Sequence, residues 1–175
     1  MCEICDGMSH EELFEREAEL IAEHGYIVRG VNGDGAHKSW AYSIGLVDIA
    51  EHPELIVVGV EAEFAMRLVQ LLCEWVLDGD YFFVGDTIQL ADQGIARIGS
   101  VHDIQYKLET FASWYALRGL GAVHADLEAL QIVLPSRLFC GTHAHQQPLL
   151  DNPHARVGEI VYPNRAERRR RKRAG

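Results

Sequence analysis

The sequence predicts an α+β protein, a single domain in which two main helices and a short third helix pack on one mixed β-sheet. Two segments, 9–24 and 61–77, place apolar residues at helical spacing. Around them lie short runs rich in β-branched and aromatic residues, and the segment 40–60 is the most apolar of these. The resulting order of helix, strands, helix, strands, short helix and strand is typical of a sheet with helices packed on it.

Composition is that of an ordinary globular domain. The chain has 175 residues, of which 48% are hydrophobic and 24% are charged, and this length suffices for a full hydrophobic core. No run of about 18 apolar residues occurs, so no membrane span is predicted. The first residues are acidic and polar, unlike a secretory signal peptide, and a cytoplasmic location is therefore expected.

Charge is divided unevenly along the chain. The net charge is −10, but the residues after Pro163 include seven basic and one acidic residue. This tail therefore carries +6 and leaves −16 for the rest of the chain. We expect a cysteine-bearing segment at 1–8, an α+β core at 9–150 and an extension with an arginine-rich tail at 151–175. An acidic body repels polyanions, so any contact with one is expected to come through the tail.

The first half of the chain contains one helix and three strands. Ser9 and Glu12 have the spacing of a capping box, and Gly25 is placed to end the helix. One face of this helix carries a periodic stripe, formed by Leu13, Phe14, Glu17, Leu20 and Ile21. A strand is expected at 26–31. Two further strands are expected at 40–46 and 54–60, joined by an acidic loop that carries His52 and Pro53.

The second half begins with the clearest helix, at 61–77, which Gly79 ends. The segment 81–101 is expected to form two or three short strands, and 103–118 a short helix. A buried strand follows at 127–134 and is ended by Pro135.

Several ordered motifs resemble one protein family. They are WAYSIGL at 40–46, HPELIVVGV at 52–60, RLVQLL at 67–72, LQIVLP at 130–135 and the opening MCEICD. The chain resembles the domain of unknown function numbered 4262, a family of bacterial, especially actinobacterial, and phage proteins. The resemblance implies an α+β fold and brings no activity with it. The segment 136–147 departs from the family's tryptophan-rich pattern, so no role is carried over to it.

A metal site is one candidate for function. Cys2 and Cys5 have two residues between them, and Cys140 is followed by His143 and His145. Thiolates and imidazoles are the ligands that zinc prefers, usually four in a tetrahedron. A zinc ion held by these residues would staple the N-terminus to the C-terminal segment. The alternative is that the cysteines are free thiols and the histidines are solvated.

A catalytic site is the second candidate. Tyr42, Ser43, His52 and Glu54 lie among apolar residues, and a serine near a histidine suggests a nucleophile and its base. No glycine-flanked nucleophile turn surrounds Ser43. Ser43 is equally explained as a small packing residue, and His52 with Pro53 as a turn.

The tail is the third candidate. Clustered cations neutralise phosphates and gain affinity by counterion release, and here they are Arg165, Arg168, Arg169, Arg170, Arg171, Lys172 and Arg173. We therefore expect contact with RNA, the ribosome or DNA. The leading hypothesis is a non-enzymatic module, metal-stapled and docked on a polyanion through its tail. The alternative is a small hydrolase-like or metal-dependent enzyme.

Overall fold

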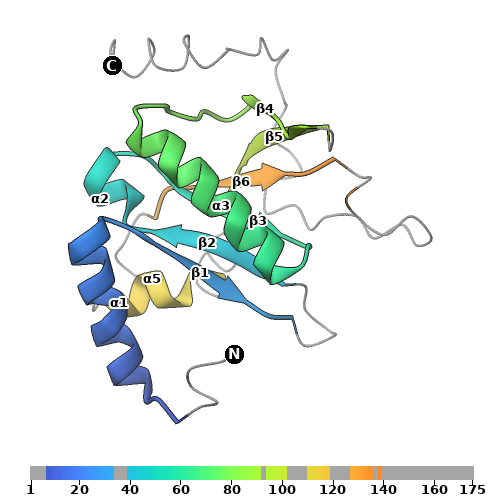
Figure 1. Ribbon diagram of the computed structural model, residues 1–175. Coiled ribbons are helices and arrows are strands. Elements are labelled where there is room, and N and C mark those ends of the chain that lie inside the picture. The colour runs from blue at the N-terminus through green and yellow to red at the C-terminus, as the bar shows by residue number, and fades with distance from the viewer. Residues whose placement is uncertain are drawn as a thin grey trace.

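The computed structural model describes residues 7–33, 39–91, 94–101, 110–118, 127–135 and 138. In chain order, its elements are α1 (His10–His24), β1 (Ile27–Val31), β2 (Trp40–Ile44), α2 (Leu46–Ala50), β3 (Glu54–Val58), α3 (Ala62–Leu77), β4 (Thr87–Gln89), β5 (Ile95–Ser100), α5 (Ala112–Leu117) and β6 (Ala129–Val133). The strands form one six-stranded sheet with helices packed on it, which confirms the predicted α+β fold (Figure 1).

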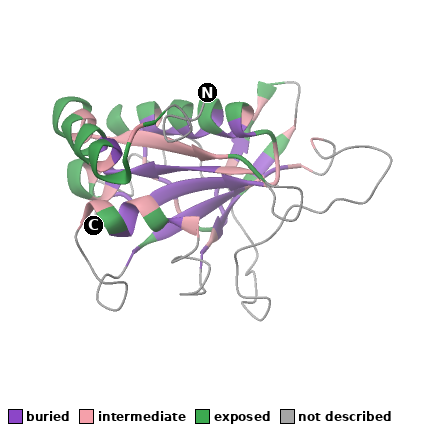
Figure 2. Cartoon of the chain, turned by 90° about the horizontal axis from the view of Figure 1, so that it is seen from below, coloured by how far each residue is buried: buried purple, intermediate pink, exposed green. Residues whose placement is uncertain are grey.

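The sheet is mixed. Its strand order is β1-β2-β3-β6-β5-β4, so β1 and β4 are the two edge strands. β3 and β6 pair in parallel, with Glu54 opposite Ala129, and the other neighbouring pairs are antiparallel. Parallel neighbours require a long crossover, and here the chain forms α3, β4, β5 and α5 between β3 and β6. The central strands are buried, whereas the outer faces of the helices are exposed (Figure 2).

Alternation along the central strands builds a separate core on each face of the sheet. Leu55 and Val57 pack with Leu68 and Leu72 of α3. Tyr42 and Ile56 point to the other face, where they meet the α5 side, including Phe111, Trp114 and Tyr115. Helix α1 lies beside α5 and β1 (Figure 1).

The ends of α1 follow the predicted capping chemistry. Ser9 Oγ accepts a hydrogen bond from the Glu12 backbone N–H, and the Glu12 carboxylate accepts one from the Ser9 N–H, so the capping box is confirmed. Gly25 has φ 83° and donates its N–H to the Ile21 carbonyl oxygen, as expected of a left-handed C-terminal residue.

The expected end of the strand at 40–46 and the loop expected after it were wrong. The strand predicted at 40–46 ends at Ile44, and the following residues form the short helix α2 where a loop was expected. Gly45 turns the chain there with φ 118°, so the strand pattern cannot continue through it. In the 81–101 segment the described residues form two strands, β4 and β5, as the prediction of two or three allowed, and Phe82 is buried in the core without being part of a strand.

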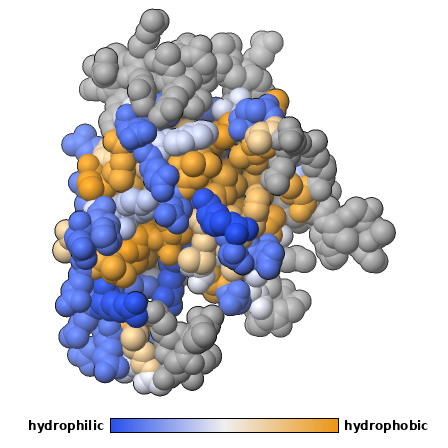
Figure 3. Space-filling view, viewed as in Figure 1, coloured by the Kyte–Doolittle hydropathy of each residue, from blue (hydrophilic) through white to orange (hydrophobic). Residues whose placement is uncertain are grey.

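Apolar side chains reach the surface on the face that carries α3 (Figure 3). The exposed ones on this helix are Met66, Leu71 and Leu77, and Ile49 of α2 is also exposed. In the described part of the chain, no helix is both long enough and apolar enough to cross a membrane.

Candidate functional site

A buried carboxylate gathers the polar groups of the 40–60 segment. Glu54, fully buried at the start of β3, accepts hydrogen bonds from the Ser43 hydroxyl at 2.6 Å and the Gly45 N–H at 2.8 Å. The Leu46 N–H at 3.4 Å and the Trp114 indole N–H at 3.3 Å also donate to it. These donors come from β2, the start of α2 and α5. One side chain therefore joins four parts of the fold.

Local geometry explains why glutamate stands at this position. The first N–H groups of a helix lack intrahelical partners, and Gly45 has no side chain with which to satisfy them. The Glu54 carboxylate satisfies them from the neighbouring strand. Gly45 is itself required here, because a Cβ on it would lie 2.4 Å from the Gly25 carbonyl oxygen.

Burial sets the electrostatics of this centre. Loss of solvent raises the pKa of Glu54 above its ordinary value, and the hydrogen bonds from Ser43, Gly45 and Trp114 oppose that rise without cancelling it. The Cys73 thiol lies in the core beside the centre, and burial raises its pKa as well. A buried thiol with a raised pKa is protonated and inert, so Cys73 packs as a small apolar residue.

The raised pKa of Glu54 predicts a specific pH dependence of stability. The folded protein holds this proton more tightly than the unfolded chain does. The stability that protonation of Glu54 adds is therefore fully present below pH 4.5, the ordinary pKa of the side chain, and is lost as the pH rises through the higher pKa of the folded state. We expect the wild type to gain stability relative to Glu54→Gln as the pH falls from neutral towards 4.5. Chemical denaturation of both proteins measures this difference. If the wild type instead lost stability relative to Glu54→Gln on acidification, the hydrogen-bond donors would be holding the pKa of Glu54 below its ordinary value.

His52 is also buried and also bonds to the backbone. The Phe82 N–H donates to His52 Nε2 at 3.0 Å, and Nδ1 lies 2.6 Å from the Pro53 carbonyl oxygen. Because a backbone N–H can only donate, Nε2 is the acceptor and Nδ1 carries the proton. The ring packs on Tyr81, with centroids 4.6 Å apart. His52 therefore anchors the segment after α3 to the start of β3.

The structure gives the predicted catalytic residues different partners. The Ser43 hydroxyl donates to Glu54 and accepts from the Leu55 N–H at 2.8 Å, so it is not directed at His52. Tyr42 points to the opposite face of the sheet, where its hydroxyl accepts from the Ser113 N–H. This arrangement holds strands and helices together, and it differs from the pairing that a serine nucleophile requires.

The other predicted sites lie outside the described residues. They are the metal ligands Cys2, Cys5, Cys140, His143 and His145, and the basic tail from Arg165 to Arg173. Within the described ranges, no group of three or more histidine, cysteine or acidic side chains is arranged to hold a metal ion. The zinc staple stays a prediction, and measuring zinc in the purified full chain tests it.

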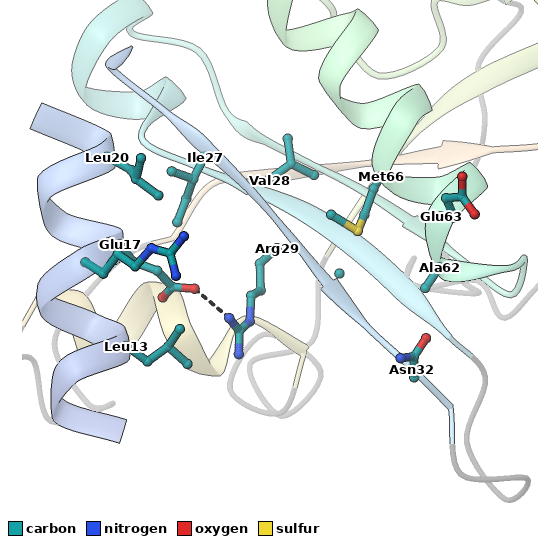
Figure 4. Close-up of a pocket in the computed structure, with 12 residues that line it drawn as sticks. Leu13, Glu17, Leu20, Ile27, Val28, Arg29, Asn32, Ala62, Glu63 and Met66 are labelled. Carbon is teal, nitrogen blue, oxygen red and sulfur yellow. Dashed lines mark hydrogen bonds and ion pairs between the residues drawn. The ribbon is translucent and has the colours of Figure 1, made fainter. Parts of the chain in front are cut away.

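A groove runs along the edge strand β1. Its volume is about 500 Å³. Helix α1 contributes one wall, α3 the other, and β1 lies between them. Residues from all three elements line the groove, among them Leu13, Arg16, Glu17, Arg29, Gly30, Glu63 and Met66. Figure 4 shows Arg29 and Glu17 pointing toward each other from β1 and α1, with Met66 reaching in from α3. The groove therefore opens on both faces of the edge strand.

Gly30 and an ion pair shape the two sides of this groove. A Cβ on Gly30 would lie 2.4 Å from Met66 Sδ, so glycine lets the methionine cover the strand. On the other side, Arg29 Nη1 donates to Glu17 Oε1 at 2.7 Å. The Glu17 side chain is 7% exposed and that of Arg29 is 27% exposed, so part of the guanidinium faces the groove. Charged and apolar surfaces thus lie side by side.

Sequence reasoning did not find this groove, although two signals pointed to it. Glu17 occupies a position in the otherwise apolar stripe of α1, where a carboxylate needs a partner. Gly30 interrupts a strand pattern, which indicates a close approach to the backbone. Neither signal reveals that 27–31 is the edge of the sheet, because edge position depends on the whole strand order.

The fold places the chain in the α+β class, with a single mixed sheet, and a buried carboxylate lies at the junction of β2, α2 and β3. The family model described as "Domain of unknown function (DUF4262)" matches residues 20–138, and the chain belongs to that family. Both the polar centre and β1 lie inside the matched range. Neither a curated protein nor a solved structure matches the chain.

Proposed function

We propose that this protein is a non-enzymatic binding module that takes an extended peptide segment along the edge of β1. The observation that carries the proposal is the groove of about 500 Å³ with β1 between two helical walls. A cleft of this size is within the range of ligand sites.

The backbone of β1 supports this proposal. Among the described strands, β1 pairs with β2 alone, through a five-residue register from Ile27 opposite Ile44 to Val31 opposite Trp40. In an antiparallel ladder, alternate residues direct their N–H and C=O groups away from the partner strand. An added strand can bond to these groups, and binding by strand addition is a recurrent mode of peptide recognition.

The helical walls support the proposal as well. Solvent-exposed edge strands promote uncontrolled pairing, and proteins often blunt or cover them. Here α1 and α3 flank β1 and leave a groove between them, so a bound segment would contact side chains on both sides of its backbone. Successive side chains of a strand point to opposite faces. Alternate residues of the segment would therefore meet Met66 and the Glu17–Arg29 pair in turn.

Truncation of Met66 tests the groove as the binding site. A randomised 12-residue peptide library displayed on phage supplies the probe, and a selected peptide is then synthesised. Met66→Ala is expected to weaken its binding about five- to tenfold, because an apolar wall contact is lost. Fluorescence anisotropy with labelled peptide measures the dissociation constant.

Leu71→Ala is the matched control. Leu71 is 43% exposed on the same helix, close to the 38% of Met66, but it does not line the groove. The proposal requires Leu71→Ala to bind like the wild type. Equal losses in both variants, or no library peptide enriched over an uncoated surface, would contradict it.

A second candidate function rests on the charge division. The tail after Pro163 carries +6 on a chain whose remainder carries −16. We propose that this tail contacts RNA, the ribosome or DNA through phosphates, without reading bases, because no aromatic residue lies in it to stack on them.

Removing the tail tests this second function. A chain ending at Pro163 is expected to lose most of its affinity for single-stranded RNA. If all seven cations make contacts, the full chain should show a salt dependence with a logarithmic slope of about −5. Filter binding of both chains across salt concentrations provides the comparison. Equal affinity of the two chains, or a flat salt dependence, would exclude docking through the tail.

A further inference from the structure

We infer that residues 157–162 of this same chain dock in the β1 groove as an added strand, so that a peptide ligand must displace them. This inference rests on the proposed function and adds the regulation of the same site. The segment lies outside the described residues, and the inference is built from its sequence, from the described groove and from the length of chain that joins the two.

The sequence of this segment is typical of a strand. Residues 157–162 read VGEIVY, and valine, isoleucine and tyrosine are enriched in strands. The segment contains every valine and isoleucine that follows Leu138. Pro163, which has no backbone N–H, closes it. Its six residues match the five-residue edge strand β1 in length.

The charges of the groove and of the segment both balance. Arg16 and Arg29 line the groove against Glu17 and Glu63, so a segment without net charge fits it best. Residues 156–162 carry one arginine and one glutamate and are therefore neutral. Residues 164–175, in contrast, are strongly basic and contain no apolar residue larger than alanine.

The two faces of the segment match the two sides of the groove. Alternation in a strand directs Ile160 and Tyr162 to one face and Glu159, between two valines, to the other. The first face suits the α3 side, where Met66 presents an apolar wall. The second suits the α1 side, where the guanidinium of Arg29 is 27% exposed. With five N–H donors, a guanidinium can bond to a second carboxylate and keep its first.

The connecting chain has the right length. The 18 residues 139–156 join Leu138 to the segment. The order β1-β2-β3-β6 places a strand added to β1 four strand spacings from β6, or about 19 Å. A flexible chain of this length has a root-mean-square end-to-end distance of about 21–25 Å. Because this length matches the span, the effective concentration of the segment is about 1 mM.

The other edge of the sheet suits the segment less well. Edge strand β4 spans only the three residues Thr87–Gln89, so it offers a shorter ladder than β1. The groove is lined by residues of α1, β1 and α3, and none of β4. An added strand at β1 therefore gains both backbone hydrogen bonds and side-chain contacts.

A proline within the segment tests the inference in the full chain. Ile160→Pro removes a backbone N–H and fixes φ, so the tethered segment should no longer add to β1. The probe is the labelled peptide selected from the library. Ile160→Pro should bind it about fivefold more tightly than the wild type, since a competitor at about 1 mM that docks with a dissociation constant of about 0.25 mM leaves the groove open about a fifth of the time.

Amide exchange reads the same open fraction without any probe. The β1 amides that point away from β2 should exchange about fivefold faster in Ile160→Pro than in the wild type. A saturating selected peptide should slow this exchange in both chains, because it fills the remaining open fraction. Ala166→Pro places the same change outside the segment and should behave like the wild type in both measurements.

The outcomes separate this inference from the proposed function. A selected peptide that depends on Met66 but binds Ile160→Pro and the wild type equally would overturn the docked segment and leave the groove standing. Unchanged β1 exchange in Ile160→Pro would overturn the docked segment as well. If protection of β1 is lost on dilution of the wild type, the segment comes from a second copy and the assignment to the same chain is wrong. Peptide binding that is insensitive to Met66→Ala, together with unchanged β1 exchange, would overturn both.

Discussion

Replacing Glu54 with alanine is expected to lower the free energy of unfolding by about 3–5 kcal/mol, because the buried donors that surround it would lose their acceptor. Those donors are the Ser43 hydroxyl, the Gly45 N–H and the Trp114 indole N–H. Each buried group left without a partner costs about 1–3 kcal/mol. Domains of this kind are stable by only about 5–15 kcal/mol, so the variant should unfold at markedly lower denaturant. Denaturant titration followed by tryptophan fluorescence measures the loss.

Two further variants separate the loss of the carboxylate group from the loss of side-chain volume and from the removal of any glutamate. Glu54→Gln keeps the shape but turns an N–H group toward backbone donors, and we expect a loss of about 2 kcal/mol at neutral pH. Glu74→Ala removes an exposed carboxylate from α3 and should change stability by less than about 0.5 kcal/mol. If Glu54→Ala cost no more than Glu74→Ala, the polar centre would not hold the fold together.

Gly45→Ala is expected to have the second largest effect, a loss of about 3–4 kcal/mol. Gly45 has φ 118°, and its new Cβ would lie 2.4 Å from the Gly25 carbonyl oxygen and 3.0 Å from the Tyr26 Cα. These are backbone atoms, so relief requires the α1–β1 junction to move away from the start of α2. Left-handed strain and the steric clash therefore add together. Thermal unfolding monitored by circular dichroism measures the loss.

Gly79→Ala isolates the strain from the clash. Gly79 also has positive φ, at 95°, but a Cβ there would meet nothing within 4 Å. It should cost only about 1 kcal/mol. Equal losses at Gly45 and Gly79 would show that the contact with Gly25 does not contribute.

The periodic elements could be predicted from the sequence because their signals are local. The capping residues Ser9 and Glu12, the glycine at 25 and the apolar spacing of α3 each act within one element. The helix α2 was missed because the N–H groups at its start bond to the side chain of Glu54. This residue lies nine positions after Gly45, in strand β3. A cap supplied from outside the helix leaves no local pattern.

The candidate sites were harder to predict, since they depend on which segments become neighbours. The sequence drew attention to Ser43, His52 and Glu54 because polar residues stand there among apolar ones. Their partners, the Trp114 indole and the Phe82 N–H, lie 60 and 30 residues away from Glu54 and His52 respectively. Without those partners, structural and catalytic serines look alike. The groove depends in addition on β1 being an edge strand, which no residue of β1 encodes.

Amide hydrogen exchange in β1 tests the central claim most directly. The full chain is followed with and without a saturating selected peptide, and exchange is read for residues 27–31. An added strand should slow exchange of those β1 amides that point away from β2, while the β4 edge on the far side of the sheet stays unchanged. Slowed exchange at β4 or on the outer face of α3, with β1 unaffected, would contradict the account.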